Sequence, residues 1–131
     1  MTAFRSKAAT TSNGYCPLEP EVRRLMGDFM KNLAGDFPFR FINTTHDLQK
    51  FGPSAAQLAT DSRCIRSGKS PIELLVDDVR FLDAAAKAGR PGVRILDTAG
   101  VVNEHSRLAG PKLPQDTHIN IWGHEADWPI I

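Results

Sequence analysis

The segment from Ser70 to Gly89 constrains the fold more than any other part of this sequence. Ser70 and Glu73 have the spacing of a capping box, in which each side chain bonds the other residue's backbone amide, and Pro71 suits the first helical position. The apolar residues that follow recur at three- and four-residue spacing: Ile72, Leu74, Leu75, Val76, Val79, Phe81, Leu82, Ala85, Ala86 and Ala88. An apolar surface this broad predicts a long central helix near residues 71–88 that packs against other elements on two sides.

A second amphipathic helix is predicted over residues 19–34. Pro20 stands in its first turn. Its apolar side chains also have helical spacing: Val22, Leu25, Met26, Phe29, Met30 and Leu33. Gly35 and Gly89 follow the two long helices and are expected to form their left-handed C-caps. Shorter helices are expected between residues 44 and 61.

Strand periodicity is concentrated in the second half of the chain. Alternation of apolar and polar residues predicts strands at residues 37–42 and 118–122. The tetrapeptide Asp97–Gly100 has the composition of a tight turn. It is predicted to join residues 93–96 to residues 101–105 in a β-hairpin.

The order of these elements predicts the fold class and the domain organisation. Helices come first and strands mostly later, which is typical of the α+β class. We expect a single domain over residues 15–131, in which N-terminal helices pack on a mainly antiparallel sheet of three to four strands. Residues 1–14 show no periodicity and are expected to form a flexible tail.

Charge and cysteine content argue against several broad classes of protein. The chain has 131 residues with 16 Lys and Arg against 15 Asp and Glu, so no overall charge indicates binding to nucleic acid or to a membrane. No apolar run reaches the roughly 18 residues that a membrane-spanning helix needs. Cys16 and Cys64 match no zinc-binding spacing. We therefore expect two free thiols in a cytoplasmic protein with no metal and no cofactor, and a disulfide between Cys16 and Cys64 stays open.

The strongest local charge directly precedes the central helix. Arg63, Arg66 and Lys69 place three cations within seven residues, and the helix N-terminus adds the positive end of its dipole. No catalytic motif of known spacing is present. The sequence therefore favours a non-enzymatic binding or regulatory module that acts through a protein partner. Arg63, Arg66 and Lys69 form its predicted docking surface for an acidic group, and self-association into a homo-oligomer stays open.

Two other functions stay open at this level. The predicted hairpin around Asp97–Gly100, placed after a block of helices, resembles the closing sheet of PAS-like sensor domains. That resemblance implies a small-ligand pocket between the long helix and the sheet. Polar residues near the C-terminus fit a small metal-dependent or histidine-based enzyme, although their spacing matches no known metal motif: His118, Asn120, His124 and Glu125.

Overall fold

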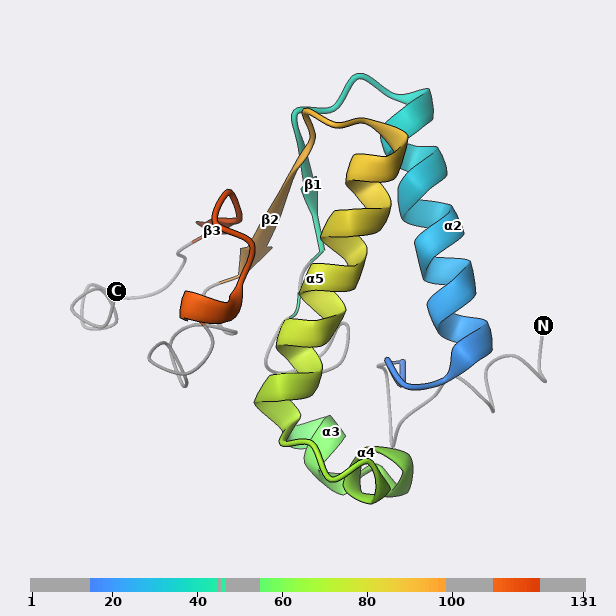
Figure 1. Ribbon diagram of the computed structural model, residues 1–131, viewed down its shortest axis with the longest axis vertical. Coiled ribbons are helices and arrows are strands. Elements are labelled where there is room, and N and C mark those ends of the chain that lie inside the picture. The colour runs from blue at the N-terminus through green and yellow to red at the C-terminus, as the bar shows by residue number, and fades with distance from the viewer. Residues whose placement is uncertain (1–14, 45, 47–54, 99–109, 121–131) are drawn as a thin grey trace.

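The computed structural model (Figure 1) describes residues 15–44, 46, 55–98 and 110–120. Its elements, in chain order, are α2 (Pro20–Asp36), β1 (Phe41–Asn43), α3 (Ala55–Thr60), α4 (Ser62–Arg66), α5 (Pro71–Gly89), β2 (Arg94–Thr98), the 3-10 helix η1 (Gly110–Lys112) and β3 (His118–Asn120). The two long helices predicted at residues 19–34 and 71–88 are confirmed as α2 and α5. The predicted tail at residues 1–14 lies outside the described residues.

The capping box predicted at the start of α5 is confirmed. The amide of Glu73 donates to Ser70 Oγ at 3.3 Å, and the amide of Ser70 donates to Glu73 Oε2 at 2.8 Å. The Ser70 amide, together with the Ser70 hydroxyl, which donates to the same oxygen at 2.8 Å, holds the pKa of the Glu73 carboxyl below its usual value. Within the described ranges no helix, α5 included, combines the length and the apolar character needed to cross a membrane.

Replacing Ser70 with alanine should lower the free energy of unfolding by about 1 kcal/mol, because the helix loses its N-cap acceptor. Ser62→Ala is the matched control, since Ser62 is an exposed first residue of α4, whose cap is the carboxylate of Asp61. Urea denaturation of both variants measures the difference. Equal midpoints for wild type and Ser70→Ala would contradict the role assigned to the capping box.

α5 forms the centre of the hydrophobic core. Its first half packs with a cluster that includes residues of α3 and α4: Cys16, Leu58, Cys64, Ile72, Leu74, Leu75 and Val76. Its second half packs with α2 and the sheet: Met30, Ala34, Ile42, Val79, Leu82, Ala86, Val93 and Ile95. In Figure 1, α2 runs along one side of α5 and the strands lie on its other side. The broad apolar surface of this helix is thus buried from more than one direction, as predicted.

Two glycines that the sequence assigns to helix caps serve the packing of α2 against α5 instead. Gly35 lies inside α2 and Gly89 is the last residue of α5, and among the described glycines only Gly68 has a positive φ, 72°. A Cβ on Gly89 would lie 2.0 Å from the carbonyl oxygen of Lys31 and 3.0 Å from the amide nitrogen of Gly35. The predicted left-handed caps at both positions are therefore wrong. Glycine at position 89 permits a backbone-to-backbone approach that any side chain would obstruct.

The sheet is parallel, which contradicts the predicted α+β fold with a mainly antiparallel sheet. β2 is the central strand of the order β1-β2-β3, and both pairings are parallel: Ile42 pairs with Ile95, and Asp97 pairs with Ile119. The physical reason lies in the connection. The chain between β1 and β2 includes α5, a crossover long enough to bring β2 back in the direction of β1.

The predicted β-hairpin is wrong where it can be compared with the structure. Asp97 and Thr98 belong to β2 rather than to a turn, and both edges of β2 are already taken by β1 and β3. Residues 99–109, which contain the rest of the predicted turn and its second strand, lie outside the described residues. Because the resemblance to the closing sheet of PAS-like domains depended on this antiparallel hairpin, it has no support in the fold.

Candidate functional site

The three cations predicted as a docking surface do not form one cluster. Arg63 is largely covered and its guanidinium pairs with Asp61 at 2.8 Å and with Glu19 at 3.4 Å. Arg66 is exposed at the end of α4. Lys69, with its side chain 51% exposed, lies in the loop before α5 and pairs with Asp77 at 2.5 Å. Lys69 lines two hollows of the described surface, and neither Arg63 nor Arg66 lines these two.

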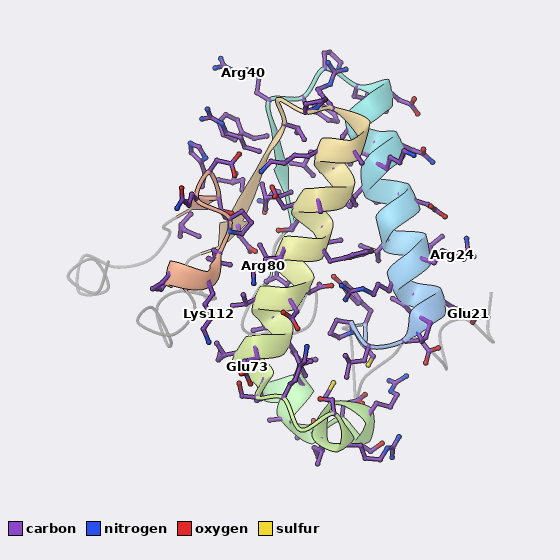
Figure 2. The ribbon with its side chains drawn as sticks, in the orientation of Figure 1. Glu21, Arg24, Arg40, Glu73, Arg80 and Lys112 are labelled. Carbon is purple, nitrogen blue, oxygen red and sulfur yellow. The ribbon has the colours of Figure 1, made fainter. Side chains whose placement is uncertain are left out.

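Two adjoining hollows meet at the Lys69–Asp77 ion pair. The first hollow, of about 330 Å³, lies between the segment leading into α2 and the start of α5: Pro17, Leu18, Pro20, Arg23, Lys69, Leu74 and Asp77. The second hollow, of about 180 Å³, lies between α5 and η1: Lys69, Glu73, Val76, Asp77, Arg80 and Lys112. Figure 2 shows Glu73, Arg80 and Lys112 together along one side of α5. The ion pair of Lys69 and Asp77 thus forms part of the wall of both hollows.

The charge lining these hollows is positive. Their walls contain the four cations Arg23, Lys69, Arg80 and Lys112 and the two acids Glu73 and Asp77, a difference of two positive charges. Both acids already have partners, since Glu73 completes the capping box and Asp77 pairs with Lys69. The guanidinium of Arg23 is positioned 4.0 Å above the ring of Phe81. This arrangement suits an anionic group next to an apolar one.

His46 is the centre of a chain of hydrogen bonds among buried polar residues. Its Nδ1 lies 2.7 Å from Asp97 Oδ2 and its Nε2 lies 3.0 Å from Asp78 Oδ2. The amide of His46 donates to Asp97 Oδ1 at 3.1 Å, and the hydroxyl of Tyr15 donates to Asp78 Oδ2. The side chains of His46, Asp78 and Asp97 are 1%, 2% and 0% exposed. This His46 network connects the segment before α2, the segment after β1, α5 and β2.

Electrostatics make the His46 network a charged structural unit. Burial alone would lower the pKa of His46, but hydrogen bonds to both carboxylates outweigh it and raise that pKa from 6.5 to about 10. Burial and the neighbouring Asp78 raise the pKa of Tyr15 above its usual value. At neutral pH the imidazole is therefore a cation that donates to two carboxylates, and it has no free nitrogen to act as a general base.

The sequence analysis did not predict this network, although the positions of Asp78 and Asp97 in the sequence indicate part of it. Asp78 stands between apolar positions of α5, one turn after Leu75 and directly before Val79. A carboxylate on a buried helix face requires a partner, so its position predicts an internal ion pair. Asp97 follows the apolar run of β2 at the carboxyl end of a strand, where polar groups of parallel sheets gather.

The histidine cluster predicted near the C-terminus can be compared with the structure at one position. His118 is exposed on β3, with its Nδ1 3.0 Å from the carbonyl oxygen of Asp116 and its ring 4.8 Å from that of Phe41. His124, Glu125 and the side chain of Asn120 lie outside the described residues. Within the described ranges, the side chains grouped closely enough to hold a metal ion are those of Cys16, Asp61 and Cys64.

Comparison with known proteins adds no family to this description. No protein-family model matches the chain, and no curated protein and no solved structure matches it significantly. Any function must therefore be argued from the geometry of the chain itself.

Proposed function

We propose that this protein is a non-enzymatic binding module that recognises an acidic segment of a protein partner in the two hollows around Lys69. The observation that carries this proposal is the excess of two positive charges along walls that also contain Pro17, Leu18 and Leu74. A segment with a carboxylate beside an apolar side chain would place the carboxylate at Lys69 and the apolar group in the first hollow. Lys69 would then leave its ion pair with Asp77, and water would solvate the Asp77 carboxylate.

The placement of the other two predicted cations narrows the docking surface. Arg63 is held by Asp61 and Glu19 and lines neither hollow, so we assign it no contact with the partner. Arg66 is exposed nearby and contributes long-range attraction. A cytoplasmic location is part of this proposal, supported by the two cysteines, which are free thiols in the described structure.

Charge reversal at Lys69 should weaken binding of an acidic partner segment by about tenfold or more, because one attractive contact becomes repulsive. The probe is a peptide selected from a random displayed library on the immobilised protein at low salt. We expect the selected peptides to contain acidic residues next to apolar ones. Their affinity, measured by fluorescence anisotropy, should fall in Lys69→Glu and Lys112→Glu, and should fall for the wild type as salt is raised.

Arg24→Glu is the matched control because it makes the same charge change on the far side of α2, where Figure 2 shows Arg24 directed away from α5. Its ion pair with Asp28 is exposed, so stability should change little. Selected peptides that bind Lys69→Glu and Arg24→Glu with equal affinity would contradict the proposed docking surface. Failure of the library to enrich any acidic peptide would contradict the function itself.

A further inference from the structure

Cys16, Asp61 and Cys64 bring metal-binding side chains together in the core, and none of the three lines either of the two hollows. The sulfurs of Cys16 and Cys64 lie 4.0 Å apart, and a carboxylate oxygen of Asp61 lies within 4.8 Å of both. Cys16 precedes α2, whereas Asp61 caps α4 and Cys64 lies within it. All three residues are buried. Ligand atoms from two distant parts of the chain therefore converge at one point.

The sulfur–sulfur distance fits a shared metal ion. Two thiolates on one tetrahedral zinc ion lie about 3.8 Å apart, because each zinc–sulfur bond is about 2.3 Å long. A disulfide would require the sulfurs to approach to about 2.05 Å. The observed 4.0 Å therefore needs only a small adjustment for metal binding, but a large one for oxidation.

Charge balance also favours a dication at this position. Asp61 receives Arg63 Nη2 at 2.8 Å and Nε at 3.2 Å, so the guanidinium compensates one negative charge beside the sulfurs. Two thiolates, the carboxylate of Asp61 and Arg63 would sum to two negative charges, and Glu19, which pairs with Arg63 at 3.4 Å, adds a third. A divalent ion would offset two of them.

We propose that Cys16, Cys64 and Asp61 bind one divalent transition-metal ion of the zinc class, with a water molecule as the fourth ligand. Binding breaks two S–H bonds, forms two metal–sulfur bonds and releases two protons to solvent. The ion would tie the segment before α2 to α4. Cys16 is followed directly by Pro17 and Leu18, so the same ion would fix one wall of the first hollow. The proposal does not depend on peptide binding there.

Titration of the reduced full-length protein with Co²⁺ tests this site directly. The chain contains two cysteines, so thiolate-to-cobalt charge-transfer absorption can arise only from Cys16 and Cys64. We expect this absorption to saturate at one equivalent of Co²⁺ and to disappear when Zn²⁺ displaces the cobalt. In weakly buffered solution at neutral pH, about two protons should be released per ion bound. A folded wild type with neither signal would overturn the proposal.

Variants assign the individual ligands. Cys64→Ser should remove the two-thiolate absorption, whereas Asp61→Asn keeps both thiolates and a good helix cap but should lower metal affinity by at least about tenfold. His118→Ala, a change at an exposed histidine, should leave the titration unchanged. Full absorption in Cys64→Ser would overturn the site, and unchanged affinity in Asp61→Asn would overturn the three-ligand assignment. If a variant does not fold, proton release by the wild type still tests whether the two thiols bind the metal ion.

Discussion

Replacing His46 with alanine should lower the free energy of unfolding by about 3–5 kcal/mol, because the change leaves the buried carboxylates of Asp78 and Asp97 without their shared cation. Both carboxylates are almost fully excluded from solvent, so water cannot replace the imidazolium without disrupting the core. Urea denaturation at pH 6, monitored by circular dichroism, measures the loss. His118→Ala is the matched control at an exposed histidine and should change stability by less than about 0.5 kcal/mol.

The effect of His46→Ala should also depend on pH in a defined direction. The pKa of His46 is raised from 6.5 to about 10 by folding, so its charged form stabilises the native state fully below pH 6.5. That contribution is lost progressively as pH rises from 6.5 towards 10. The stability difference between wild type and His46→Ala should therefore shrink over this range. A difference that stays constant from pH 6 to pH 10 would show that His46 is not a buried cation.

Gly89→Ala should lower the free energy of unfolding by about 3 kcal/mol, at the upper end of the cost of overpacking a core. The new methyl group would lie 2.0 Å from the carbonyl oxygen of Lys31, which is backbone and has no rotamer to change. α2 and α5 would have to separate, and that movement would loosen the cluster that contains Met30, Val79 and Leu82. Thermal and urea denaturation of the purified variant measure the loss.

Gly92→Ala provides the control for this substitution. Gly92 lies three residues further along the chain, and a methyl group there meets no atom within 4 Å. We expect Gly92→Ala to be neutral or slightly stabilising, because alanine restricts the unfolded chain more than glycine does. If Gly89→Ala proved as stable as Gly92→Ala, the close approach of α2 to α5 would be wrong.

The sequence by itself determined the two long helices. The capping box at Ser70 and the apolar periodicity of α5 act within a few residues, so their outcome depends little on the rest of the chain. The same holds for α2, which begins at Pro20, one residue after the predicted start. Local signals of this kind predict a helix without any knowledge of which elements pack against it.

Only the tertiary structure decided the direction of the strands and the role of several residues. Asp97 and the residues after it suit a tight turn by local chemistry, yet Asp97 lies in the central strand because β1, β3 and His46 all bind β2 there. Gly89 is a plausible cap in sequence, but its role comes from Lys31 on another helix. β1, His46 and Lys31 lie more than fifty residues from their partners in the sequence, and β3 lies 22 residues from β2.

The candidate sites also contain some features that the local sequence indicates and others that only the tertiary structure shows. Lys69 could be singled out from the charge near a helix N-terminus. The first hollow beside it exists because the segment 17–23 folds against α5, and the second exists because η1 lies beside α5. The pairing of Cys16 with Cys64 and of His46 with Asp97 joins residues 48 and 51 positions apart. No local pattern specifies such pairs, because their energy comes from burial and charge compensation that arise when the core closes.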